Sequence, residues 1–174
     1  IRYFHKTSGQ DYLILSERDD LPQKRYWGMY IFRLGETADY IIQAPRPLSE
    51  KNTFEYAVSL FEQIKAGALM ISTTHPKANQ DGSSDIIQLE NKESVFTLVN
   101  QVLIREFGPD PLMVVQCRAM GFNPEYSLPD ADALLSFKSG VKLFDAFDSQ
   151  TIHLMETLKS KGLRIQLIDG SQST

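Results

Sequence analysis

Short apolar runs alternate with amphipathic stretches along most of the chain. Three runs rich in β-forming residues come first, at residues 12–15, 28–34 and 40–44. Charged and turn-forming residues separate them, which predicts an antiparallel entry into a sheet. The segment 35–38 is expected to form a hairpin turn between the second and third runs.

A helix is expected after Asn52, because Glu55 follows three residues later and apolar side chains then recur at helical spacing. Asn52 is expected to cap its start and Gly67 to end it. The buried-looking run 68–73 follows at once. Strand, helix and strand in this order predict that the runs 40–44 and 68–73 are parallel, joined by a right-handed crossover.

The remaining pattern adds two helices and three strands. Helices are expected from about 91 to 108 and from 148 or 149 to 162, and strands at 112–115, 133–137 and 163–168. This alternation predicts one α/β domain over residues 1–174, with three layers and a mixed, largely parallel central sheet.

Three of the apolar runs end in polar turns. Residues 40–44 lead into Arg46 between two prolines, residues 68–73 lead into His75, and residues 112–116 lead into Cys117 and Arg118. In open α/β sheets, ligands lie outside the carboxyl ends of the strands. The sequence therefore predicts a site at this edge of the sheet.

Each candidate side chain at this edge has two interpretations. Arg46 and Arg118 have the planar geometry to share one anion, or each pairs with a nearby acid such as Glu50 or Glu125. His75 either packs at the end of its strand or binds a metal together with Asp81 or Asp85. Cys117 is either a small core residue or a thiolate nucleophile beside Arg118.

Composition excludes several classes of protein. The net charge of −4, from 22 acidic and 18 basic residues, lacks the basic footprint of a nucleic-acid binder. No apolar stretch approaches the ~18–20 residues that cross a bilayer. One cysteine rules out an internal disulfide, and neither a glycine-rich phosphate loop nor a G-x-S-x-G serine-hydrolase motif occurs. Composition leaves the localisation nearly unconstrained.

About the central half of the chain resembles bacterial α/β domains of the zinc carboxypeptidase, N-formylglutamate amidohydrolase and poly-γ-glutamate hydrolase type. The resemblance is carried by residues 44–47 with Glu50 and Thr53, 74–76, 85–88 and 115–122. It implies metal ligands at the strand ends, with a Pro-His-type turn, an acid and then a Thr-His-type turn. This chain has Arg46 where the first histidine is expected, and Gln88 and Arg118 stand where other ligands are expected.

The resemblance therefore implies a degenerate hydrolase without a cofactor, because a guanidinium cannot coordinate zinc and repels a divalent cation. In this interpretation Arg46, His75, Gln88 and Arg118 bind an anionic small molecule, an acidic peptide or a glycan. One alternative is an active amide or peptide hydrolase that holds one metal ion, zinc for example, through His75 and a nearby carboxylate: Asp85, Asp81 or Glu50. The other is a non-catalytic interaction domain of a larger protein, since the chain opens at Ile1 without Met.

Overall fold

The protein is represented by a computed structural model. It describes residues 2–5, 9–18, 20, 25–88, 91, 94–106, 112–119, 131–137 and 149–169. The chain divides into two compact units, Ile1–Gly121 and Phe122–Thr174. The expectation of a single domain over residues 1–174 stays a prediction.

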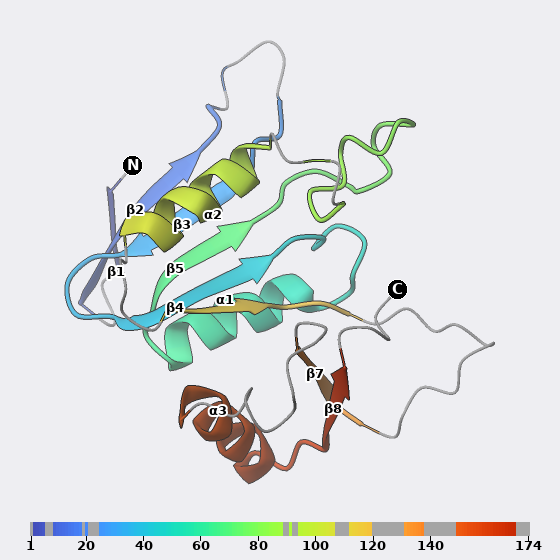
Figure 1. Ribbon diagram of the computed structural model, residues 1–174. Coiled ribbons are helices and arrows are strands. Elements are labelled where there is room, and N and C mark those ends of the chain that lie inside the picture. The colour runs from blue at the N-terminus through green and yellow to red at the C-terminus, as the bar shows by residue number, and fades with distance from the viewer. Residues whose placement is uncertain are drawn as a thin grey trace. The chain divides into compact units, whose positions relative to one another are not determined.

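The described part of the first unit contains a six-stranded sheet in the order β1-β2-β3-β5-β4-β6 (Figure 1). Its strands are β1 (Arg2–His5), β2 (Gln10–Ser16), β3 (Met29–Arg33), β4 (Ala38–Ala44), β5 (Ala66–Ile71) and β6 (Met113–Gln116). The pairs β1–β2, β2–β3 and β3–β5 are antiparallel, whereas β4 pairs in parallel with β5 and β6. The α/β class and the mixed sheet are confirmed. The expectation that the sheet is largely parallel is wrong, because antiparallel pairs outnumber parallel ones.

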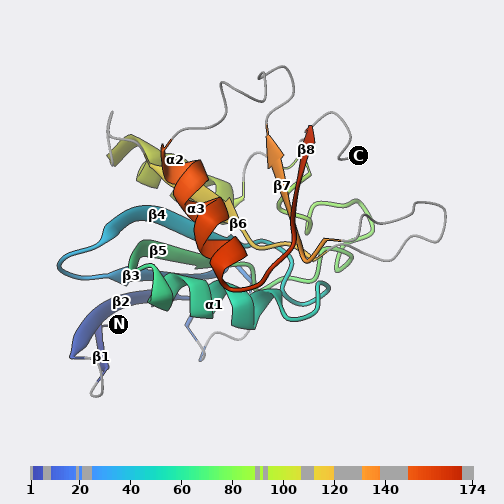
Figure 2. The same cartoon turned by 90° about the horizontal axis from the view of Figure 1, so that it is seen from below.

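Helices α1 (Thr53–Gln63) and α2 (Val95–Glu106) cover opposite faces of this sheet (Figure 2). Adjacent strand residues point to opposite faces. Ile42 therefore packs with Phe61 of α1, while Ile41 packs with Phe96 of α2. All six residues of β5 are buried, as a strand between two helix layers requires. The expected three layers are present within this unit.

Two local expectations are wrong. Residues 35–38 do not form a hairpin turn, because the strands that they connect, β3 and β4, are separated in the sheet by β5. The apolar strand β5 takes this central position, where both of its faces are buried. Gly67 lies inside β5, and α1 ends earlier, where Lys65 takes a left-handed φ of 52°. Asn52 is at the N-cap of α1 as expected, but its side chain makes no capping hydrogen bond.

The second unit contains the expected strand, helix and strand. They are β7 (Ala133–Phe137), α3 (Ser149–Ser160) and β8 (Ile165–Asp169), and β7 pairs in parallel with β8. Arg164 Nε and Nη2 donate to Asp132 at 3.0 and 2.9 Å, and these bonds lower the pKa of Asp132 to about 2. Among the described helices of the whole chain, none has the length and hydrophobicity needed to cross a membrane.

Arg33 at the end of β3 is a buried cation, with 8% of its surface exposed. Its guanidinium donates to the Tyr12 hydroxyl and the Phe61 carbonyl, both at 3.2 Å, and to the Ala66 carbonyl at 3.3 Å. It also lies 3.2 Å from Glu62 and over the aromatic rings of Tyr12 and Phe61. Arg33 thereby ties β2, β5 and the end of α1 together.

Replacing Arg33 by Met is expected to lower the free energy of unfolding by about 2–3 kcal/mol, because buried carbonyl groups lose their donor. Arg105→Met is the control, since Arg105 is 74% exposed on α2, and it should change stability by less than about 0.5 kcal/mol. Urea denaturation measures both values. Equal effects of the two substitutions would contradict the structural role of Arg33.

Candidate functional site

The carboxyl ends of β4, β5 and β6 open on one edge of the sheet, because the three strands are mutually parallel. The turn after β4 carries Arg46 and Glu50, the segment after β5 carries His75 and Asp85, and Arg118 follows β6. Side chains separated by up to about 70 positions can therefore meet at this edge.

Arg46 forms a two-pronged ion pair with Asp85. Its Nε donates to Asp85 Oδ1 at 2.9 Å, and its Nη2 donates to Oδ2. The Nη1 atom of Arg46 also lies 3.8 Å from Oε1 of Glu50, which is four residues further along the chain. These contacts raise the pKa of Arg46, chiefly through the hydrogen bonds to Asp85.

Arg118 forms an ion pair with Glu50, the second carboxylate near Arg46. Its Nε donates to both oxygens of Glu50, at 2.9 and 3.0 Å, and its Nη2 lies 2.8 Å from Oε1. The backbone N–H of Ala119 donates to Glu50 Oε2 at 2.9 Å. We call Arg46, Glu50, Asp85 and Arg118 the ion cluster.

The two positive and two negative charges of the ion cluster cancel. Its carboxylates are the more deeply buried members, with side chains 10% exposed in Glu50 and 6% in Asp85, against 27% in Arg46 and 35% in Arg118. In the structure each arginine pairs with an acid of the protein, as one of the two interpretations expected. Arg46 pairs with Asp85, and Arg118 pairs with Glu50. Glu125 lies outside the described residues.

His75 and Gln88 are exposed and take no part in the ion cluster. His75 Nδ1 accepts a hydrogen bond from the backbone N–H of Lys77 at 3.1 Å. The Gln88 side chain packs over Gly82, where an added Cβ would lie 2.8 Å from Gln88 Oε1. Of the four residues expected to bind a ligand, the structure thus joins Arg46 and Arg118 through Glu50 and leaves His75 and Gln88 apart from them.

The described side chains do not fit a zinc site on His75 and Asp85. Both oxygens of Asp85 are engaged by Arg46. Asp81 is exposed, and its Oδ1 accepts from the backbone N–H of Ser83 at 3.0 Å. Within the part of the chain that the structure describes, no three His, Cys, Asp or Glu side chains gather closely enough to hold a metal ion.

A pocket of about 290 Å³ lies beside Arg118, and we call it the amide pocket. Three amide side chains form a ladder along its wall: Gln43 Nε2 donates to Asn100 Oδ1 at 2.7 Å, and Gln116 Nε2 donates to Gln43 Oε1 at 2.9 Å. Its lining residues are Gln43, Ile86, Ile87, Phe96, Thr97, Asn100, Gln116 and Arg118.

The sequence interpretation missed the amide ladder, although it left a signal. Gln43 is a polar residue inside the buried run of β4, where it is 2% exposed, and Asn100 lies in the middle of α2. A buried amide needs hydrogen-bond partners. A polar residue within the buried strand run and another in the middle of the helix were therefore the sequence signal for the amide ladder.

Cys117 is a buried residue, and its backbone N–H donates to the Gln43 carbonyl at 2.7 Å. Burial raises the pKa of its thiol to about 11, so the thiol stays protonated at neutral pH. This environment suits the small-core-residue interpretation and not a thiolate nucleophile.

Comparisons with protein-family models, curated proteins and solved structures found no match to this chain.

Removing the cation of the Arg46–Asp85 pair is expected to destabilise the protein more than removing the carboxylate. Arg46→Gln should lower the free energy of unfolding by about 3 kcal/mol, because it leaves the buried carboxylate of Asp85 without a counter-charge. Asp85→Asn should lower the free energy of unfolding by less, about 1–2 kcal/mol, because the Arg46 guanidinium stays partly exposed to water and close to Glu50. Urea denaturation of both variants tests the order.

The exposed Arg18–Asp20 pair provides the control for this measurement. Its side chains are 75% and 66% exposed, so Arg18→Gln is expected to change stability by less than about 0.5 kcal/mol. Equal losses in Arg46→Gln and Arg18→Gln would show that the ion cluster contributes nothing beyond a surface pair.

Proposed function

We propose that this chain is a hydrolase-like α/β domain with a degenerate metal site, and that it binds an anionic small molecule, an acidic peptide or an acidic glycan at the carboxyl edge of β4, β5 and β6. The observation that carries this proposal is the position of Arg46 between Glu50 and Asp85. Two buried carboxylates facing one cation are the setting in which a hydrolase would hold a metal ion.

A guanidinium in that position supports a binding function over metal-dependent hydrolysis. Arg46 neutralises the carboxylates that a metal would need as ligands, and it has no lone pair with which to coordinate a metal itself. A divalent ion would have to displace Arg46 and leave a guanidinium close by. The ion cluster therefore favours the degenerate, anion-binding domain over an active hydrolase built on His75 and Asp85.

Arg118 is the residue best placed to receive a ligand. It lines the amide pocket, and its bonds to Glu50 use Nε and one side of Nη2. A guanidinium has five N–H donors, so the edge formed by Nη1 and Nη2 can bind a second carboxylate in the two-pronged geometry that arginine prefers. The amide side chains of Asn100 and Gln116 would then bind the polar atoms next to that carboxylate.

The neutral charge of the ion cluster limits what an anion can gain. Long-range attraction is weak when two arginines are already balanced by two acids, so affinity depends on short hydrogen bonds in the pocket. We expect modest affinity that depends little on salt. This behaviour differs from that of a highly basic surface, whose binding falls steeply as salt rises.

Binding of glutarate, a γ-linked glutamate tripeptide and galacturonate tetrasaccharide, measured by calorimetry, tests the proposal. At least one probe should bind, and Arg118→Gln should weaken it about tenfold or more, since a charge-assisted hydrogen bond contributes about 1.5–3 kcal/mol. Arg105→Gln, on the exposed face of α2, is the matched control. A metal chelator should leave the affinity unchanged.

Two results would contradict the proposal. Affinity that Arg118→Gln leaves intact would remove the assigned anion site. Hydrolysis of γ-glutamyl or N-acyl amino-acid substrates that stops when a chelator is added would instead establish the active metal-dependent hydrolase.

A further inference from the structure

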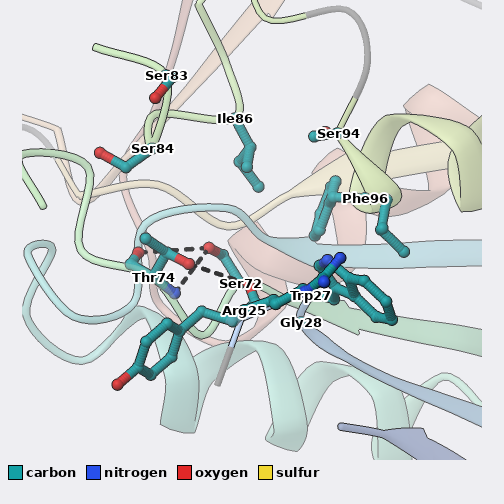
Figure 3. Close-up of a pocket in the computed structure, with 12 residues that line it drawn as sticks. Arg25, Trp27, Gly28, Ser72, Thr74, Ser83, Ser84, Ile86, Ser94 and Phe96 are labelled. Carbon is teal, nitrogen blue, oxygen red and sulfur yellow. Dashed lines mark hydrogen bonds between the residues drawn. The ribbon is translucent and has the colours of Figure 1, made fainter. Parts of the chain in front are cut away.

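A second pocket, of about 180 Å³, lies in the first unit at the carboxyl end of β5 (Figure 3). Hydroxyl groups are its most frequent polar lining, and they belong to Ser72, Thr74, Ser83, Ser84 and Ser94. Arg25 is the one charged residue among its described lining residues. We call this space the hydroxyl pocket.

Several of these hydroxyls already bond within the protein: Ser84 donates to the Pro76 carbonyl at 2.8 Å and Thr74 to the Tyr26 carbonyl at 3.0 Å. Ser83 Oγ accepts from Asn79 Nδ2 at 2.8 Å, which leaves its hydrogen for a ligand. This uncharged polar lining suits a ligand whose hydroxyl groups both donate and accept.

Two exposed aromatic residues, Tyr26 and Trp27, also line the hydroxyl pocket. Tyr26 is 55% exposed and Trp27 is 49% exposed. The guanidinium of Arg25 lies 5.6 Å from the centroid of the Trp27 ring, so this charge is already engaged on an aromatic face. Large aromatic side chains at the mouth of a polar pocket are the usual means of packing against an apolar ligand face.

The backbone that carries these aromatic residues is fixed in place. Glu17 accepts hydrogen bonds from the N–H groups of Arg25 and Tyr26, at 2.5 and 2.7 Å. The hydroxyl of Thr74 donates to the Tyr26 carbonyl at 3.0 Å, and Tyr26 holds a left-handed φ of 55°. A bulky residue in that conformation carries a cost that only surrounding contacts maintain.

Gly28 closes the same turn. Its N–H donates to Thr73 Oγ1 at 3.1 Å, and its φ is 102°. A Cβ at this position would lie 2.9 Å from the Tyr30 hydroxyl and 3.0 Å from the Ile71 carbonyl. The turn is thus built tightly against β5, while the side chains of Tyr26 and Trp27 are left in solvent.

The hydroxyl pocket and the amide pocket share two lining residues, Ile86 and Phe96. They therefore adjoin along the same edge of the sheet, one lined by hydroxyl groups and the other by amides and Arg118. A ligand of two or more linked units can occupy both. At about 180 Å³ the hydroxyl pocket is smaller than the roughly 300 Å³ of a drug-sized site, so it would take one small unit.

We propose that the two pockets together bind an acidic oligosaccharide, with an uncharged sugar ring in the hydroxyl pocket against Trp27 and a carboxylate-bearing sugar in the amide pocket at Arg118. This inference rests on the proposed function and selects the acidic glycan from its three ligand classes. Sugar rings match the site because they combine hydroxyl groups with an apolar C–H face. A sugar is favoured over an acidic peptide because a sugar ring presents an apolar C–H face to the exposed Trp27 ring, whereas a glutamate side chain presents no comparable face.

The chain contains a single tryptophan, so intrinsic fluorescence reports on the hydroxyl pocket directly. The probes are hyaluronan tetrasaccharide, which alternates acidic and uncharged sugars, chitotetraose, which is uncharged, and the γ-linked glutamate tripeptide. Hyaluronan tetrasaccharide should change the Trp27 emission and bind more tightly than chitotetraose. Calorimetry should show Trp27→Ala weakening hyaluronan binding about tenfold, with a smaller loss in Ser83→Ala.

Phe54→Ala is the matched control, because Phe54 is an exposed aromatic residue of α1 that lines neither pocket. It should leave hyaluronan affinity unchanged. Circular dichroism checks that each variant is folded, and Trp27→Phe, which keeps an aromatic ring, should retain most of the affinity.

The inference and the proposed function can fail separately. If the glutamate tripeptide binds through Arg118 while hyaluronan tetrasaccharide leaves Trp27 emission unchanged, the glycan inference is overturned and the anion site stands. If chitotetraose binds as tightly as hyaluronan and Arg118→Gln affects no acidic probe, both the acidic glycan and the anion site are overturned. Hyaluronan binding that is equal in wild type and Trp27→Ala also overturns the inference.

Discussion

The guanidinium of Arg46 lies between two carboxylates that have little access to water, those of Glu50 and Asp85. Buried carboxylates are stable only when a cation and hydrogen bonds compensate them. Arg46 and Arg118 provide that compensation, and in doing so they fasten together the turn after β4, the segment after β5 and the end of β6. The geometry of the whole strand-end edge depends on this ion cluster.

The same constraint determines what chemistry this edge supports. Because the charges cancel, the site neither attracts metal ions strongly nor has the long-range field of a basic patch. The groups that remain for a ligand act at short range. They are the Nη1 and Nη2 edge of Arg118, the amide ladder that begins at Gln43, and the hydroxyl groups of the pocket beside Trp27. Such groups bind a polar ligand through several hydrogen bonds, whereas hydrolysis of an amide bond requires an activated water and groups that stabilise the oxyanion formed on the amide carbonyl. These groups therefore favour the proposed binding function over metal-dependent hydrolysis.

Local sequence patterns predicted the helices and most strands, because these follow from periodicity and from the order of strand, helix and strand. They also placed Arg46 and Arg118 at one edge of the sheet, where both contact Glu50. They did not predict that β5 inserts between β3 and β4, since strand order depends on contacts between distant segments. The pairing of Arg46 with Asp85, 39 positions away, has the same origin. The sequence identified the arginines, but only the fold shows that they are already neutralised.

The central claim is that an arginine, and not a metal ion, compensates Glu50 and Asp85. Anomalous diffraction at the zinc edge, from crystals grown with excess zinc, tests it most directly. We expect no anomalous peak between these carboxylates and clear density for the Arg46 guanidinium bonded to Asp85. An anomalous peak held by Asp85 and Glu50, with Arg46 turned away, would contradict the account.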